Sequence, residues 1–360
     1  MTARSPSSTD ERHGLRASLF LLGILVTFFG SCDHSFGEDP VRPGTRGDFL
    51  LIVGSPGEPV YESQFNSWAD DWKQVVIQGG LHFRQIGPAP TSDPSGTLTE
   101  IDSALKELST GKERPLWIVL IGHGTFDGRT AKFNLPGPDL EPAQLAKWLN
   151  PIQRPIAIVN CFSCSAPFLP ALSKPGRVVI TSTMNGNEVN FSRFGGELVK
   201  AISSPDADLD KDGQVSLLEA FLKAATATEE FYAGDGRLAT EHAVLDDNGD
   251  GRSVPLAGFD GLRAKNRTDS GASLPDGLRA HQWNVIVNPA DLALSPEVLA
   301  RRNELEIQIF ELTQRKLEFS PVEYDSRLEE LLLELAALIL PNPARDPPPA
   351  GDTSPERTEK

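Results

Sequence analysis

Two short segments of this chain carry residues that could perform nucleophilic catalysis. His123 stands between Gly122 and Gly124 directly after an apolar run, and Cys161 and Cys164 follow the next long apolar run. A histidine flanked by glycines is free of side-chain crowding, so its imidazole could act as a general base and acid. The N–H of Gly124 could then donate to an oxyanion, and a thiol on the adjacent strand could be the nucleophile.

The same side chains have other interpretations. A turn histidine can make a structural hydrogen bond, and a buried cysteine packs as a small apolar residue. Cys161 and Cys164 also form a C-x-x-C pair, which could cycle between a dithiol and a disulfide as in thioredoxin-like proteins. Three classes of function stay open at this point: an enzyme with a cysteine nucleophile, an inactive binding scaffold, and a thiol-disulfide protein.

An acidic segment at residues 208–219 has the spacing of an EF-hand-like Ca²⁺ loop. Carboxylates stand at loop positions one, three and five, a glycine at position six and a glutamate at position twelve. The residue at position seven would offer its carbonyl oxygen, and the glutamate would bind with both oxygens. A solvated acidic turn is the alternative. The sequence therefore predicts a structural Ca²⁺ ion, with Asp208, Asp210, Asp212, Gln214 and Glu219 as its ligands.

The elements that must position these residues follow from the hydropathy pattern of residues 47–288. Apolar runs of strand length alternate with amphipathic runs of helix length, which indicates an α/β domain with a mostly parallel sheet and helices on both faces. In such a sheet, catalytic groups lie at the carboxyl ends of the strands, so we expect His123 and the two cysteines at one edge. The expected strands are residues 49–53, 81–86, 116–121, 156–159 and 177–181, with a possible last strand at 283–287. The expected helices are residues 61–78, 98–109, 142–149, 191–203 and 217–232.

The order of these motifs resembles the cysteine peptidase group of caspases, legumain and gingipains. Residues 118–124 read Ile-Val-Leu-Ile-Gly-His-Gly and are followed by an apolar strand that ends at a cysteine. Residues 54–57, Tyr61, Gln64 and residues 133–140 resemble the legumain branch in particular. The likeness spans roughly residues 49–183. It implies a caspase-like fold and hydrolysis of peptide bonds, with His123 as the base and Cys161 or Cys164 as the nucleophile.

The sequence departs from the family pattern at the nucleophile. An ungapped alignment of the strand at residues 156–159 places Phe162 on the nucleophile position, one residue after Cys161 and two before Cys164. Val60 stands where legumain has an asparagine that assists the histidine. The resemblance therefore leaves open both a peptidase and a catalytically inactive relative, a pseudoenzyme that would bind a peptide or protein partner.

The N-terminus reads as a targeting segment. Three arginines precede the apolar run at residues 17–29, which ends at Gly30, Ser31 and Cys32. This pattern predicts a signal peptide over residues 1–32, of the lipoprotein type if Cys32 takes a lipid that attaches the protein to a membrane. Ordinary cleavage and an uncleaved anchor are the alternatives. We expect an exported protein of the cell envelope, the periplasm or the extracellular space, with residues 33–46 as a linker.

The overall charge and the C-terminal region predict two further properties of the protein. The net charge of −16, without a cluster of lysines or arginines, argues against a nucleic-acid partner. Residues 293–340 repeat leucine and isoleucine at helical spacing and predict an αα-hairpin that turns at Ser320 and Pro321. Residues 341–360 are rich in proline and acidic residues, and we expect them to be a disordered tail.

Overall fold

The structure is a computed structural model, and it describes residues 45–88, 96–110, 114–265 and 274–339. The predicted signal peptide, most of the predicted linker and the predicted C-terminal tail lie outside the described residues. Within the described ranges, no helix combines the length and the apolar character that a membrane span requires.

A seven-stranded sheet, in the order β2-β1-β3-β6-β7-β8-β9, organises the described part of the chain. Its first five strands pair in parallel, and the last two add antiparallel pairs at one edge. The central strands are buried at every residue and are mostly aliphatic, as expected for a parallel sheet covered on both faces. The parallel strands are β1 (Asp48–Val53), β2 (His82–Ile86), β3 (Leu116–Ile121), β6 (Ile156–Cys161) and β7 (Arg177–Thr181), and the antiparallel ones are β8 (Val244–Asp246) and β9 (Val254–Pro255).

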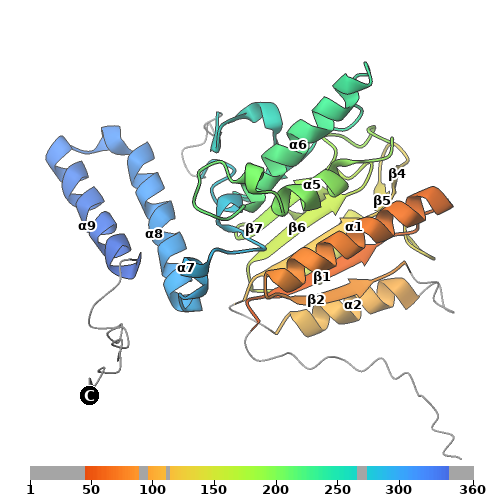
Figure 1. Cartoon of the computed structure of the whole chain (residues 1–360), viewed down its shortest axis with the longest axis horizontal. Helices are drawn as coiled ribbons and strands as arrows, with labels where there is room; N and C mark the ends of the chain where they lie inside the picture. Colours follow the sequence, from red (N-terminus) through yellow and green to blue (C-terminus); the bar gives the residue numbers. More distant parts are fainter. Residues whose placement is uncertain (1–44, 89–95, 111–113, 266–273, 340–360) are drawn as a thin grey trace, which may run out of the picture. The chain divides into compact units, whose positions relative to one another are not determined.

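Helices cover both faces of this sheet. One face packs against α1 (Pro59–Gln78), α5 (Phe194–Ile202) and α6 (Leu217–Gly234), which lie together in Figure 1. The opposite face packs against α2 (Gly96–Leu108), α3 (Pro142–Leu149) and α4 (Phe168–Leu172). Successive strand residues alternate between these two cores. The face that a residue near a strand end presents therefore decides which helices it meets.

The predicted fold class is confirmed: a mostly parallel sheet has helices on both faces, and helices close the described chain. The last helices are α7 (Pro289–Leu292), α8 (Pro296–Gln314) and α9 (Pro321–Ile339). Arg301 of α8 pairs with Glu334 of α9 at 2.7 Å, and the turn at Ser320 lies where the sequence predicts it. The α8–α9 pair is the αα-hairpin.

Several short elements escape the sequence pattern because two or three residues are too few to show a period. They include β8 and β9 of the main sheet. The others are the two-stranded pairs β4 (Gly124–Phe126) with β5 (Ala131–Phe133) and β10 (Phe259–Asp260) with β11 (Arg263–Ala264), and the 3₁₀ turns η1 (Pro205–Ala207), η2 (Leu256–Gly258), η3 (Ala280–Gln282) and η4 (Lys316–Glu318).

The possible strand at residues 283–287 was a wrong prediction. Asn284 makes a single bridge to Ser216, and no ladder forms there. The carbonyl groups that a strand would use have other partners, since the guanidinium of Arg46 donates to the carbonyls of Asn284 and Val285. The helix predicted from residue 191 begins instead at Phe194, because the Glu241 carboxylate accepts the N–H groups of Arg193 and Phe194 at that point.

Candidate functional site

His123 lies just beyond the end of β3, within an aromatic cluster. Its ring centroid is 4.6 Å from that of Tyr61, 5.1 Å from that of Phe65 and 5.9 Å from that of Phe191. Nε2 is 3.2 Å from the carbonyl oxygen of Pro56. The half-buried setting lowers the pKa of His123, because loss of water disfavours the imidazolium. Burial thus favours the neutral imidazole, and a backbone carbonyl engages Nε2.

The predicted oxyanion donor, the N–H of Gly124, already has a partner. It donates to Oγ of Ser163 at 3.1 Å, and the same hydroxyl donates back to the carbonyl of Gly124 at 3.2 Å. The two backbones lie so close that a Cβ on Gly124 would be 2.0 Å from the carbonyl oxygen of Ser163. Gly124 is therefore required for close packing, and its amide is committed to a structural hydrogen bond.

Cys161 is the last residue of β6 and faces the helices of the α1–α5–α6 side. It is 1% exposed and belongs to that hydrophobic core. A Cβ on Gly195 of α5 would be 2.6 Å from the Cβ of Cys161, so the helix packs directly on this thiol. Burial, and then the Glu241 carboxylate, raise the pKa of Cys161. The residue behaves as a small apolar core side chain.

Cys164 lies in the loop after β6, with a left-handed backbone φ of 60°. It is buried, and its Sγ is 3.8 Å from the carbonyl oxygen of Gly124. Its own N–H donates to the carbonyl of Glu188 at 3.0 Å. Burial is the main cause that raises the pKa of this thiol, with a smaller contribution from the Glu188 carboxylate. Both described cysteines are free thiols.

Phe162 occupies the position that the ungapped alignment assigns to the nucleophile. Its ring is fully buried in the core on the other face of the sheet. It packs against Phe133, with ring centroids 4.8 Å apart, and against Phe168, with centroids 5.1 Å apart. The side chain at this position is therefore part of the fold's interior and cannot be reached by a substrate.

The structure brings only some of the predicted catalytic residues together. Cys164 approaches Gly124, but within the described ranges neither thiol has a hydrogen bond to His123. A working pair needs a thiolate next to an imidazolium, which requires a lowered thiol pKa and a raised imidazole pKa. The shifts at His123, Cys161 and Cys164 run in the opposite directions.

The acidic loop between η1 and α6 gathers three of its predicted ligands. One carboxylate oxygen from each of Asp208, Asp210 and Asp212 lies within 4.8 Å of the others. Gly213 makes the turn with φ of +88°, and its N–H donates to Oδ2 of Asp208. Oδ1 of Asp208 is buried and has no hydrogen-bond partner among the described residues, which is costly for a carboxylate oxygen. A divalent cation at this point would satisfy that oxygen, so the donor set fits Ca²⁺.

Glu219, the predicted closing ligand, lies outside this cluster of aspartates. One of its oxygens accepts the N–H of Leu209 at 2.7 Å, and the other accepts both the N–H and the hydroxyl of Ser216 at 2.8 Å. Ser216 in turn accepts the N–H of Glu219, which makes a capping box at the start of α6. Glu219 thus ties the loop to the helix.

Gln214 uses its side chain to connect the loop to the C-terminal segment. Its amide nitrogen donates to Asp212 at 3.0 Å and to Asp291 of α7 at 3.1 Å. Its amide oxygen accepts the N–H of Asn288 at 3.2 Å. The sequence pattern suggested only a backbone ligand at this position, and contacts across more than seventy residues leave no local signal.

Comparisons with known proteins add a likeness in structure but none in sequence. No family model matches the chain, and the comparison with curated proteins finds no match. Solved structures similar to the chain include two insect caspases. The first is caspase-1 from Spodoptera frugiperda, which has 12% sequence identity and a TM-score of 0.38 and covers 56% of this chain and 86% of its own. The second is the Drosophila initiator caspase Dronc, which has 11% sequence identity and a TM-score of 0.40 and covers 59% of this chain and 83% of its own.

A protein from Geobacter sulfurreducens is also similar, with 12% identity, a TM-score of 0.33 and coverage of 50% of this chain and 87% of that one. At TM-scores below 0.5, the three likenesses transfer no activity to this chain.

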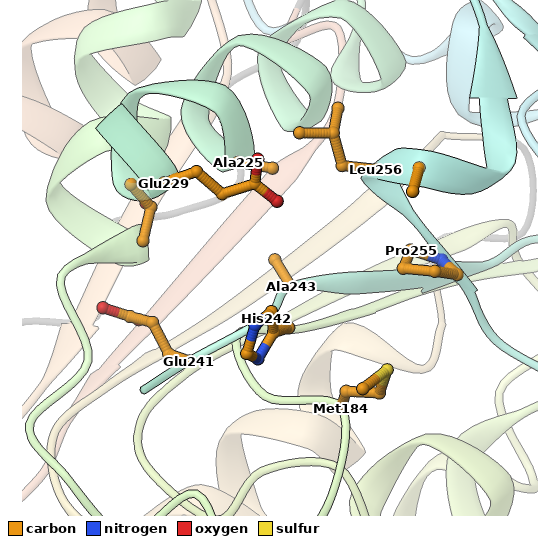
Figure 2. A pocket seen from close by; sticks show the side chains of 10 residues that line it. Met184, Ala225, Glu229, Glu241, His242, Ala243, Pro255 and Leu256 are labelled. Atoms are coloured by element: carbon orange, nitrogen blue, oxygen red, sulfur yellow. The ribbon is translucent and has the colours of Figure 1, made fainter. Parts of the chain in front are cut away.

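A pocket between α6 and the β8–β9 edge is the feature of the site region that sequence reasoning missed. Figure 2 shows its lining, which includes Glu229 of α6, His242 next to β8, and Leu256. Nδ1 of His242 is 2.9 Å from a carboxylate oxygen of Glu188, which orients the imidazole. These residues come from three separate segments and form no motif, so only the folded chain brings them together.

Proposed function

We propose that this chain is a calcium-braced protein of the peptidase-like α/β fold that binds a peptide or protein partner and does not cleave it. The observation that carries the proposal is the burial of both thiols away from the imidazole of His123. The predicted export signal suggests that it acts at or beyond the cell envelope.

The chemistry of the strand ends supports a binding role over hydrolysis. A protonated, buried thiol is a poor nucleophile, and burial raises the pKa of both Cys161 and Cys164. The amide that would stabilise an oxyanion is occupied by Ser163, and a core phenylalanine stands at the nucleophile position of the related peptidases. Each of these residues serves packing or backbone pairing.

The acidic loop supports the calcium part of the proposal. Burial, together with the neighbouring carboxylates of Asp212 and Glu219, raises the pKa of Asp210. This mutual repulsion of carboxylates is what a bound divalent cation relieves. Because the loop contacts both α6 and the segment before α8, a cation there would brace the two segments against each other.

A second candidate function is a cysteine peptidase with Cys164 as its nucleophile. The observation in its favour is that Sγ of Cys164 lies 3.8 Å from the carbonyl oxygen of Gly124, the residue after His123. For this function the loop after β6 would have to move, because the thiol would need to reach the imidazole. A thiol-disulfide role for Cys161 and Cys164 is less well supported, since Cys161 is enclosed by the core.

Thiol labelling of the full chain tests the proposal. Wild type and His123→Ala would be treated with a peptide-based electrophile and with iodoacetamide at neutral pH, and labelled sites would be identified by mass spectrometry. We expect slow labelling of both Cys161 and Cys164 that the substitution does not change. Labelling in denaturant is the control for reagent quality, because unfolding exposes both thiols.

The other functions give different results in the same experiment. Rapid alkylation of Cys164 that His123→Ala slows at least about tenfold would establish the peptidase. Loss of labelling after mild oxidation, restored by reductant and abolished by substitution of either cysteine, would establish the thiol-disulfide protein. Either result would overturn the binding scaffold.

A further inference from the structure

A cavity of about 210 Å³ lies between α6 and the β8–β9 edge, on the helix-covered face that also holds Cys161. Figure 2 shows that its walls are mainly apolar, with Ala225, Ala243, Pro255 and Leu256 around it and Met184 at its border. Small-molecule sites in proteins usually enclose about 300 to 1,000 Å³. The cavity is therefore of a size for one long side chain and not for a larger ligand.

The carboxylate of Glu229 is the charged group of this cavity that no described residue pairs with. Figure 2 shows its carboxylate directed over the pocket near Ala225. Glu229 is exposed, and among the described residues it forms neither an ion pair nor a side-chain hydrogen bond. A carboxylate beside an apolar wall gains most from a cation that brings its own apolar stem.

The other polar groups of the lining already have partners. Glu241 is 1% exposed, and its carboxylate accepts hydrogen bonds from Ser192, Tyr232 and the backbone N–H groups before α5. His242 is held by Glu188 through Nδ1. Among the described residues that line the pocket there are two carboxyl groups, those of Glu229 and Glu241, and neither a lysine nor an arginine, so no cation of the lining competes for Glu229.

From this geometry we propose that the cavity binds one basic side chain, a lysine or an arginine, of a partner polypeptide. The aliphatic stem lies between Ala225 and Leu256, and the charged end pairs with Glu229. Charge complementarity favours this occupant over an acidic one, and the apolar walls favour it over a hydrated ion. The inference rests on the proposed binding function, for which it names the chemistry of the partner.

The test uses the full chain and fluorescein-labelled peptides with one variable residue among alanines. Lysine, arginine, norleucine and glutamate at that residue separate the contribution of the charge from that of the stem. Fluorescence anisotropy should give an affinity for the lysine and arginine peptides at least about tenfold higher than for the norleucine peptide, a difference of roughly 1.4 kcal/mol. The glutamate peptide should bind more weakly than all of them.

Substitutions locate the effect within the pocket. Glu229→Gln should lower the affinity for the lysine peptide about tenfold and leave the norleucine peptide unchanged. Glu230→Gln, on the next residue of the same helix and outside the pocket, is the matched control and should change neither. Leu256→Trp should fill the cavity and weaken all four peptides, with unfolding curves to confirm that each variant is folded.

The outcomes separate this inference from the proposed function. Equal affinities for the lysine and norleucine peptides, an unchanged affinity in Glu229→Gln, or binding of none of the peptides would overturn it. If thiol labelling reveals an active peptidase while the lysine preference and its loss in Glu229→Gln persist, the pocket stands and the non-cleaving function falls.

Discussion

At the scale of single residues, chemistry is decided by which face of the sheet a side chain presents. Cys161 and Phe162 are neighbours in sequence, yet they enter opposite cores. His123 is half-buried among aromatic rings, and this loss of water lowers its pKa, although the contact with the carbonyl of Pro56 partly opposes the shift. A histidine and two cysteines that could serve catalysis are thus present, but their surroundings give them structural roles in the core and at the strand ends.

The pH dependence of thiol labelling follows from these surroundings. Alkylation requires the thiolate, and burial raises the pKa of both described thiols above its ordinary value. In native protein the labelling rate should therefore keep rising through pH 9, by about tenfold per pH unit, without a plateau near neutrality. Rates measured from pH 6 to pH 10 check this, and a plateau below pH 8 would indicate an activated thiol.

A second prediction at this scale concerns the contact between α5 and Cys161. Gly195→Ala would place a Cβ 2.6 Å from that of Cys161, and we expect this to destabilise the protein by about 1 to 3 kcal/mol, despite the better helix propensity of alanine. Gly234→Ala in α6 is the control, because nothing lies within 4 Å of its added Cβ. Urea unfolding measures both, and equal stabilities would show that the packing at Cys161 is loose.

At the scale of elements, the acidic loop joins parts of the fold that are distant in sequence. Glu219, in the first turn of α6, completes the capping box with Ser216 and so binds the helix to the loop, while Gln214 contacts Asn288 and Asp291 before α8. The position of the loop and its three aspartates could be predicted, because turn glycines and ligand spacing are local properties. The capping role of Glu219 and the link through Gln214 could not, since they depend on where other segments lie.

Calcium should stabilise the protein through this loop. A ligand that binds only the folded state adds stability by mass action, about 4 kcal/mol at a thousand times its Kd. Excess Ca²⁺ should raise the Tm of wild type relative to chelator, and Asp208→Asn should abolish this rise, because Oδ1 of Asp208 is the oxygen without a partner. Asp206→Asn, on an exposed residue outside the loop, should keep the full response. Identical melting curves of wild type with Ca²⁺ and with chelator would exclude the site.

Over the whole described chain, the sequence predicts the parallel strands of the sheet far better than its antiparallel edge, β8 and β9. A long apolar run such as β3 is recognisable because every one of its residues is apolar and buried. β8 and β9 are too short to show a pattern and are defined by their pairing, of β8 with β7 and of β9 with β8. The pocket next to them, with Glu229 and His242, was invisible for the same reason.

The αα-hairpin of α8 and α9 contacts the rest of the described chain mainly through polar side chains. Its contacts with the preceding chain include the ion pair of Arg302 with Asp291 at 2.6 Å and the donation from Gln282 to the carbonyl of Asn303 at 2.8 Å. The sheet and its two cores contain no residue of α9. A chain that ends at Leu294 should therefore still unfold cooperatively. We expect its free energy of unfolding to be lower by about 1 to 3 kcal/mol, because buried polar groups such as the carboxylate of Asp291 lose their partners.

Urea unfolding followed by both circular dichroism and tryptophan fluorescence checks this, because coincident transitions indicate a single cooperative unit. Asp291→Asn in the shortened chain should recover part of the lost stability, since it removes the carboxylate that Arg302 no longer pairs. A broad transition, or two probes that disagree, would mean that the hairpin is an integral part of the α/β domain. An unchanged calcium response in the shortened chain would show in addition that the loop at residues 208–219 forms without α8 and α9.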